Sequence, residues 1–235
     1  MKIGLAAYEY RNNDIPFNIS QMEAAARQAR GKAELLCFGE TFLQGFDSLC
    51  WDFERDRKVG VSQTSDCMKR IRAVSAESGV DLLFGYIELE GERLYSSCAV
   101  IAGGEILHNY RRVSVGWKEH WKTDAHYCEG TDTSSFLYRG RRIKLALCGD
   151  LWDMPDRFRT EDLLIWPVYV SFTPEEWELE RLEYAEQAGR VADRTLMVNA
   201  ITKEPKAHGG AFDFVRGRVN GQLPCDREDI LVVKA

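Results

Sequence analysis

The segment Lys144-Leu-Ala-Leu-Cys148-Gly-Asp150-Leu-Trp152 decides how the rest of the chain is interpreted. Apolar residues alternate with others up to Cys148, which is the two-residue period of a β-strand. Gly149 then permits a tight turn. A cysteine at such a strand end can present its sulfur at the rim of a sheet, where nucleophiles of α/β hydrolases are found. The alternative is a small buried core thiol, because free cysteine is among the residues most often buried.

Strand and helix patterns alternate along the whole chain. Strands are expected at residues 2–8, 34–38, 81–88, 95–101, 105–110, 143–148, 163–167, 195–201 and 230–234. Helices are expected from a cap at Asn18 or Ser20 to Gly31, from Ser62 to Ser78, and after the capping box Thr173–Glu176. No repeat or linker-like change of composition interrupts this order. We therefore expect one mixed-sheet α/β domain over residues 1–235.

The composition is that of an ordinary globular protein, with 45% hydrophobic and 29% charged residues in 235. A net charge of -6 and a pI near 5.4 argue against nucleic acid or an anionic membrane as a partner. No apolar run reaches the ~18–20 residues of a membrane span, and the apolar N-terminal run is too short for a secretory signal. We therefore expect a cytoplasmic protein.

The cysteines and histidines give no pattern typical of a metal site. The seven cysteines are odd in number, are scattered and form no C-x-x-C pair, which argues against a disulfide framework or structural zinc. They are Cys37, Cys50, Cys67, Cys98, Cys128, Cys148 and Cys225. The four histidines show no ligand spacing. We expect reduced thiols and no bound metal.

Glu40 directly follows the apolar strand 34–38. A carboxylate at a strand end in a largely apolar neighbourhood is expected to have a raised pKa, which suits a general base. The alternative is a solvated loop glutamate. A thiol, a carboxylate and a cation at the ends of different strands would form a coherent catalytic site. The base would take the thiol proton, the thiolate would attack a carbonyl or nitrile carbon, and the cation would hold the oxyanion.

Two motifs resemble those of the nitrilase, or carbon-nitrogen hydrolase, superfamily. The stretch 36–46 is similar to the family's L-x-x-x-P-E-x-x-x-x-G-[YF], with Gly39 where proline is usual and Glu40 at the glutamate. The stretch 143–155 is similar to I-x-x-x-x-C-x-D-x-x-x-P, with Cys148 at the cysteine and the proline about one residue late. Further similar segments are Phe84–Glu88, Leu94–Ile101 with Ser96 replacing an asparagine, Gly189–Arg194 and Val198–Asn199.

This resemblance implies a fold and an activity. The fold is a four-layer α-β-β-α sandwich with mixed sheets, usually as a homodimer. Glu40 is the implied general base and Cys148 the implied thiol nucleophile. The implied reaction is hydrolysis of a non-peptide C–N bond through a cysteine thioester, and no cofactor is needed. The substrate would be a small amide or nitrile-like molecule. We favour an amidase over a nitrilase because amide hydrolysis is the broader activity of the superfamily.

The chain departs from the family at the expected cation. The family has Y-R-K before the cysteine strand, with lysine as oxyanion stabiliser, whereas this chain has Tyr110-Arg111-Arg112. Arginine keeps the charge but is planar and always protonated. Either Arg112 takes the role, or Lys118 reaches into the site from the following loop. A compact ammonium favours Lys118. Glu119 follows Arg112 at a spacing similar to that of the family's second glutamate, which positions the substrate.

Several interpretations stay open. Trp117 and Trp152 flank the motifs and are candidates for an apolar substrate pocket, although such aromatic residues often belong to the core. Because Arg112 replaces the lysine, the alternative to an enzyme is an inactive family member that binds a small carboxylate or a protein partner. A half-enzyme passing ammonia to a synthetase is disfavoured, since no second domain is recognised. Residues 203–228, with several glycines, suggest a trimmed surface region or part of a dimer contact.

Overall fold

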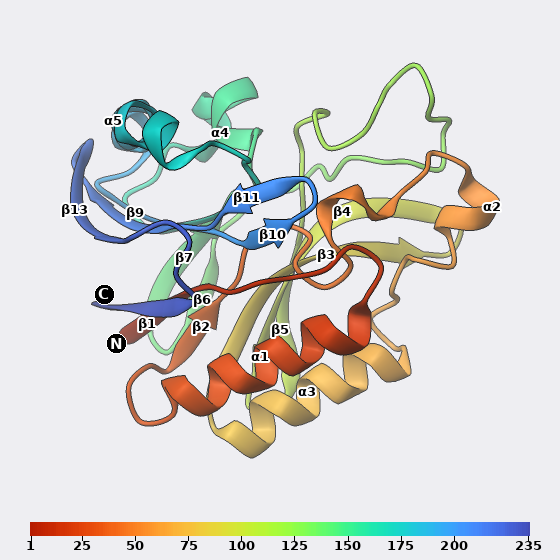
Figure 1. Ribbon diagram of the computed structural model, residues 1–235, viewed down its shortest axis with the longest axis horizontal. Coiled ribbons are helices and arrows are strands. Elements are labelled where there is room, and N and C mark those ends of the chain that lie inside the picture. Colours follow the sequence, from red (N-terminus) through yellow and green to blue (C-terminus); the bar gives the residue numbers. More distant parts are fainter.

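Two six-stranded mixed sheets lie face to face, and helices cover their outer surfaces (Figure 1). The computed structural model describes all residues from Met1 to Ala235. The chain builds the first sheet almost completely before it enters the second. Its last strand then returns to the first sheet beside its first strand. The layers are therefore helix, sheet, sheet and helix, and the four-layer α-β-β-α sandwich expected from the sequence is confirmed.

The first sheet has the strand order β14-β1-β2-β3-β4-β5. Its strands are β1 (Lys2–Ala7), β2 (Leu35–Cys37), β3 (Asp81–Glu90), β4 (Arg93–Ala102), β5 (Glu105–Arg111) and β14 (Asp229–Lys234). The pairs β1–β2 and β2–β3 are parallel, and the others are antiparallel. The outer pair joins distant parts of the chain, because Lys2 lies opposite Lys234. The hairpin predicted at Gly103 and Gly104 is confirmed, and both glycines have positive φ.

The second sheet has the order β13-β12-β9-β8-β7-β6. Its strands are β6 (Phe136–Tyr138), β7 (Arg141–Leu145), β8 (Leu163–Val168), β9 (Arg194–Asn199), β12 (Ala211–Val215) and β13 (Arg218–Leu223). The pairs β7–β8 and β8–β9 are parallel. The strands β10 (Ile201–Lys203) and β11 (Lys206–His208) form a separate hairpin. Parallel strands place their carboxyl ends at one edge of a sheet, and both candidate motifs follow such strands.

Helix α1 (Ile15–Ala29) begins earlier than predicted. The side chain of Asp14 caps it by accepting the backbone N–H of Phe17 at 3.1 Å. The prediction of Asn18 or Ser20 as the cap is therefore wrong. Asn18 is instead a buried residue inside the helix, and its side-chain amide donates to the backbone carbonyl groups of Arg11 and Leu43. The signal that the sequence analysis missed is Asp14 followed by Pro16, because proline is favoured in the first turn of a helix.

Helices α3 and α5 cover opposite outer faces of the two sheets (Figure 1). Helix α3 (Asp66–Ser78) begins one turn later than predicted, with Ser65 as its cap and the predicted Gly79 at its end. Helix α5 (Pro174–Val191) begins at the predicted capping box, in which Thr173 and Glu176 bond reciprocally. The short helical segments are η1 (Phe46–Ser48), α2 (Phe53–Asp56), α4 (Asp150–Asp153) and η2 (Pro155–Phe158).

Two apolar clusters hold these layers together. The larger fills the space between the sheets and continues beneath α5, and it includes Leu5, Leu145, Trp166 and Met197. The second lies between the first sheet and helices α1 and α3, and it includes the buried residues Ile19, Met22, Ala26, Ala29, Met68 and Ile71. Burial of these faces stabilises the fold by roughly 25 cal/mol per Å² of apolar surface.

The interpretation of residues 203–228 as a surface region is wrong for their central part. Strand β12 pairs with β9 on one side and β13 on the other. Phe212 and Phe214 are buried beneath α5 and belong to the larger core cluster. The run Ala211-Phe-Asp-Phe-Val215 is apolar at four of its five positions, as in a strand buried on both faces, so the signal was present despite the neighbouring glycines.

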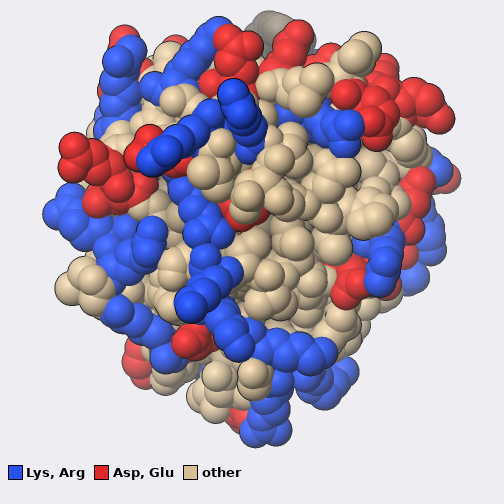
Figure 2. Space-filling view, turned by 90° about the vertical axis from the view of Figure 1, so that its left-hand side faces the viewer, with Lys and Arg blue, Asp and Glu red and all other residues tan.

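The outer surface carries charges of both signs. Figure 2 shows the face with β13 and both chain ends, where Lys and Arg side chains form a band beside a broad area without charged groups. Asp and Glu side chains gather toward the upper rim of the same face. None of the helices combines the length and the apolar character that crossing a bilayer would require.

Candidate active site

Cys148 lies in the turn between β7 and α4. The strand is shorter than predicted, since it ends at Leu145. The backbone of Cys148 has φ 38°, a left-handed conformation that costs free energy for a residue with a side chain. Its N–H donates to the carbonyl of Pro167 at 3.0 Å, and its own carbonyl accepts from Trp166 Nε1 at 2.9 Å. The turn is thus fixed on the neighbouring strand, and Sγ lies 3.6 Å from the carbonyl oxygen of Tyr169.

Glu40 lies in the loop after β2, which crosses closely over β3. The crossing requires Gly85, because a Cβ there would lie 2.4 Å from the backbone nitrogen of Thr41. The backbone N–H of Glu40 donates to the carbonyl of Val168 at the end of β8, 3.2 Å away. The carboxylate therefore sits between the two sheets, with none of its side chain exposed.

Arg112 is the cation that contacts Glu40. Its Nη1 lies 2.9 Å from Glu40 Oε1, and Ser96 Oγ donates to the same oxygen at 3.0 Å. Arg112 itself is only 3% exposed, so the pair is shielded from water. The largely apolar neighbourhood expected for Glu40 is therefore wrong. Glu40 Oε2 is buried with no hydrogen-bond partner in the protein, which leaves one carboxylate oxygen free.

The remaining nitrogens of Arg112 are held differently. Nε donates to Ser114 Oγ at 2.7 Å, while Nη2 has no protein acceptor and lies against Gly149. Burial opposes the charge of Arg112, but the nearby carboxylates of Glu40 and Asp150 outweigh burial and raise the pKa of its guanidinium. Arg112 is thus a permanent cation with one free donor beside the cysteine turn.

The thiol of Cys148 is protonated at neutral pH. Burial raises its pKa to about 12, and the Glu40 carboxylate acts in the same direction, while Arg112 lowers it. A thiol in this state becomes a nucleophile only when a base removes its proton. The candidate for such a base is Glu40, whose Oε2 has no partner in the protein.

Asp150 connects the two sides of the site. Its carboxylate accepts from Tyr110 OH at 2.5 Å, from the N–H groups of Val113 and Ser114 at 3.1 and 2.8 Å, and from the N–H of Leu147 at 2.8 Å. It is fully buried. Asp150 therefore fixes the residues after β5 against the turn that carries the thiol. The sequence analysis named Asp150 only as a position of the family motif. An acidic residue beside apolar neighbours was the one local sign that it could be buried and hydrogen-bonded.

Lys118 does not take the position that its chemistry favoured. Its Nζ lies 2.7 Å from Glu129 Oε1 and also donates to the carbonyl of Tyr127. These contacts hold the loop between β5 and β6 together. The cation paired with Glu40 is therefore Arg112 and not Lys118, and which of the two stabilises an oxyanion stays a prediction.

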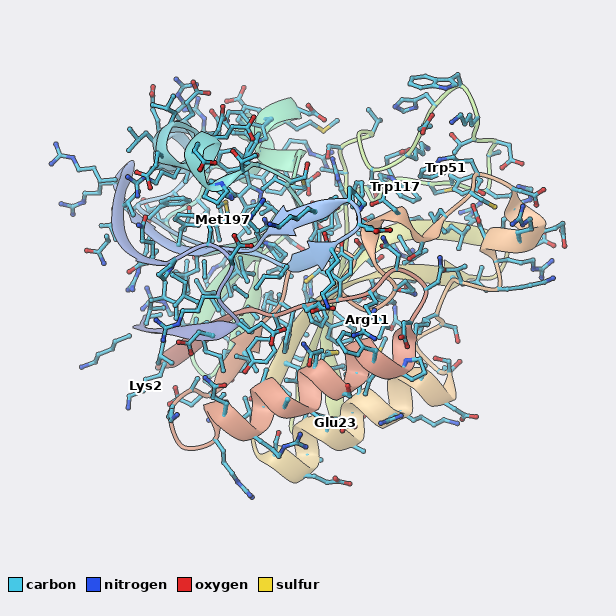
Figure 3. All side chains as sticks on the ribbon, in the orientation of Figure 1. Lys2, Arg11, Glu23, Trp51, Trp117 and Met197 are labelled. Atoms are coloured by element: carbon cyan, nitrogen blue, oxygen red, sulfur yellow. The ribbon has the colours of Figure 1, made fainter.

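The other predicted site residues contact different partners. Glu119 pairs with Lys122, three residues along the loop, at 2.8 Å. Trp117 is buried in a small apolar cluster and lies beside Trp51 (Figure 3), on the side of the molecule away from α5. Trp152, on α4, is 40% exposed and packs on the rings of Trp166 in β8 and Tyr184 in α5. Substrate contacts of Glu119, Trp117 and Trp152 stay predictions.

The chain brings together no cluster of three or more His, Cys, Asp or Glu side chains suited to hold an ion. All seven cysteines are free thiols. A polar cavity of about 500 Å³ lies beside β5 and the loop after it, and neither Glu40 nor Cys148 lines it.

Comparison with known sequences finds one protein family. The model of the carbon-nitrogen hydrolase family matches residues 2–159. An (R)-stereoselective amidase of Pseudomonas sp. is 24% identical over 168 residues, which cover 68% of this chain and 55% of the amidase. The glutamine-dependent NAD(+) synthetase of Thermotoga maritima is 23% identical over 158 residues, 65% of this chain and 26% of the synthetase. The chain thus spans about half the first relative and a quarter of the second.

Solved structures show the same fold. An amidase from Nesterenkonia sp. AN1, whose active-site cysteine carries the Michael adduct of acrylamide, has TM-score 0.80 at 19% identity, covering 100% of this chain and 93% of that one. The glutamine-dependent NAD+ synthetase of Acinetobacter baumannii has TM-score 0.76 at 18% identity, covering 98% and 44%. The resemblance seen in the motifs is confirmed by the family match, which extends over more than half of the sequence. The chain belongs to the carbon-nitrogen hydrolase family.

Proposed function

We propose that this protein hydrolyses the C–N bond of a small non-peptide amide, releasing a carboxylic acid and ammonia. Cys148 is the nucleophile, Glu40 the general base and Arg112 the cationic stabiliser. The observation that carries the proposal is the buried Arg112–Glu40 pair, 2.9 Å apart, beside a thiol held on a strained turn. The amidases among the relatives support an amide over a nitrile substrate.

The first half-reaction forms a thioester. Oxygen Oε2 of Glu40 accepts the thiol proton, and the thiolate of Cys148 attacks the amide carbon. The oxyanion accepts hydrogen bonds from Arg112 Nη2 and from the N–H of Gly149, neither of which has an acceptor in the protein. When the tetrahedral intermediate collapses, its C–N bond breaks and the nitrogen leaves as ammonia with the proton from Glu40. Arg112 cannot supply that proton, because it stays charged.

The second half-reaction restores the enzyme. Glu40, again a carboxylate, takes a proton from water, and the resulting hydroxide adds to the thioester carbon. The same two donors hold the second oxyanion. The C–S bond then breaks, and the Cys148 sulfur regains a proton from Glu40. Every proton passes through Glu40, so its removal should stop both halves.

The test measures ammonia release from small aliphatic amides, ω-amides and N-carbamoyl compounds. Wild-type protein should turn over at least one class, and Cys148→Ala should turn over none. As a second readout, incubation with acrylamide and intact-mass measurement should show one adduct that maps to Cys148 by peptide analysis. Turnover that survives in Cys148→Ala would exclude the thiol mechanism.

The alternative function is a binding protein that does not turn over. It is favoured if the wild type releases no ammonia from any compound while a small carboxylate still raises its melting temperature.

The family resemblance also suggests a homodimer, which light scattering with sedimentation would test. A mass near the chain's own 26.9 kDa would contradict it.

A further inference from the structure

Gly149 has a backbone conformation that any residue could adopt. Its φ and ψ are -64° and -11°, in the right-handed helical region. Glycine is therefore not needed for the turn itself. A Cβ added at this position would nevertheless lie 2.5 Å from Nη2 of Arg112 and 3.4 Å from Oγ of Ser114. The first distance is too short for a real contact, so the obstacle to a side chain is the guanidinium.

The guanidinium is not free to move aside. Its Nη1 is bonded to Glu40 and its Nε to Ser114, at 2.9 and 2.7 Å. Because the group is planar, a shift of Nη2 turns both of these nitrogens out of line. Arg112 is also almost fully buried, so no open space is available for a different rotamer. A side chain at 149 would therefore displace the cation from the thiol.

We propose that Gly149 is a positioning residue matched to Arg112. Its missing side chain opens the space in which Nη2 of an arginine can lie beside the cysteine turn. The backbone N–H of Gly149, which belongs to the same turn, has no acceptor in the protein. A lysine at 112 ends in a single nitrogen and would not fill this space. The identity of residue 149 should therefore matter only while residue 112 is arginine. The effect on turnover rests on the function proposed above.

The test is a double-mutant cycle with wild type, Gly149→Ala, Arg112→Lys and the double variant. Gly149→Ala in the wild-type background should lower kcat about a hundredfold with little change of KM, as expected for loss of one oxyanion donor. In the Arg112→Lys background the same change should cost less than about threefold. Gly221→Ala, where a Cβ would meet its nearest atom at 3.8 Å, is the matched control.

A second readout does not depend on turnover. Arg112 lowers the pKa of the Cys148 thiol, so its displacement should shift the pH profile of Cys148 alkylation by iodoacetamide to higher pH. The profile of Gly149→Ala should therefore be shifted relative to wild type. The profile of the double variant should not be shifted relative to Arg112→Lys. Peptide mapping separates Cys148 from the more exposed thiols, such as Cys50.

The outcomes separate this inference from the proposed function. Equal losses from Gly149→Ala in both backgrounds, or an unshifted alkylation profile with Arg112 present, would overturn the matched pair. If no substrate is turned over but the alkylation profile shifts only with Arg112, the pair stands and the proposed hydrolysis fails. Melting temperatures of all four proteins identify a variant that is unfolded. If Gly149→Ala is unfolded while the double variant is folded, the cost of the alanine depends on Arg112 as the matched pair requires, whereas unfolding by the alanine in both backgrounds overturns it.

Discussion

Arg112 Nη1 lies 2.9 Å from Glu40 Oε1, although 72 residues separate them in the chain. The sandwich brings them together from the end of β5 and the loop after β2. Removing two such charges from water is costly, and their mutual attraction offsets that cost only while both are present. In the proposed reaction Glu40 takes the thiol proton, so the charge of Arg112 then balances the thiolate of Cys148 and the net charge of the three groups does not change. Fold and chemistry therefore depend on the same contact.

The Glu40→Gln substitution leaves Arg112 as an uncompensated buried charge. We expect it to lower the free energy of unfolding by about 3–5 kcal/mol, measured by urea denaturation. Glu54→Gln is the control, because Glu54 lies on the surface in a weak pair with Arg57, and it should change stability by less than about 0.5 kcal/mol. Equal stabilities of the two variants would show that the buried pair does not support the fold.

The same Glu40→Gln protein should have a more acidic thiol. The Glu40 carboxylate helps to raise the pKa of Cys148 to about 12, so removing its negative charge should lower that pKa. In wild type, alkylation of Cys148 should rise about tenfold per pH unit through pH 10 without a plateau. In Glu40→Gln the profile should move to lower pH while ammonia release is lost. A profile that stays in place would mean that Glu40 does not act on the thiol.

Asp150→Asn should disrupt the connection between the end of β5 and the cysteine turn. The amide group of asparagine would face at least one N–H donor, and each buried donor left unsatisfied costs about 1–3 kcal/mol. We expect a loss of stability of more than about 2 kcal/mol and slower alkylation of Cys148 at high pH. Asp156→Asn, at an exposed position, is the matched control. Unchanged stability in Asp150→Asn would contradict the role of its four hydrogen bonds.

Lys118→Met and Arg112→Met should differ in what they impair. Lys118 holds the loop after β5 through Glu129 and the carbonyl of Tyr127, so its loss should increase proteolysis of that loop. Its effect on kcat should stay below about tenfold, whereas Arg112→Met should lower kcat by about a hundredfold or more. Limited proteolysis and steady-state kinetics measure the two effects. The reverse order of kcat losses would return the oxyanion role to Lys118.

Local patterns were enough to predict most of the fold. The two-residue alternation before Cys148 and the apolar run before Glu40 placed Cys148 at the end of a strand and Glu40 just beyond one, whereas Cys148 lies three residues after the end of β7. The capping box before α5 fixed the start of that helix. These signals work because strand period, turn residues and caps act over a few neighbouring residues. The family motifs then supplied the pairing of the two sheets, which local patterns do not contain.

The contacts between distant residues were not predictable in the same way. Arg112 reaches Glu40 because β4 and β5 pair with Ser97 opposite Arg111, and one residue of slip would turn the guanidinium to the other face. Lys118 has the charge that an oxyanion stabiliser needs, but the sequence does not show that the fold places Glu129 next to it. The fit between Gly149 and Arg112 likewise depends on a distance of a few ångströms and not on composition.

The pairing of β1 with β14 has a consequence for how the protein is made. Lys2 is translated long before Lys234, which lies opposite it, so the outer edge of β1 has no partner until β14 has been made. At about 5–20 residues per second, that interval is roughly ten to fifty seconds. Throughout it an apolar strand with open hydrogen-bonding groups is available to neighbouring nascent chains. Yield in cells should therefore depend on the speed of synthesis and on chaperones that cover this strand, more than on the stability of the finished sandwich.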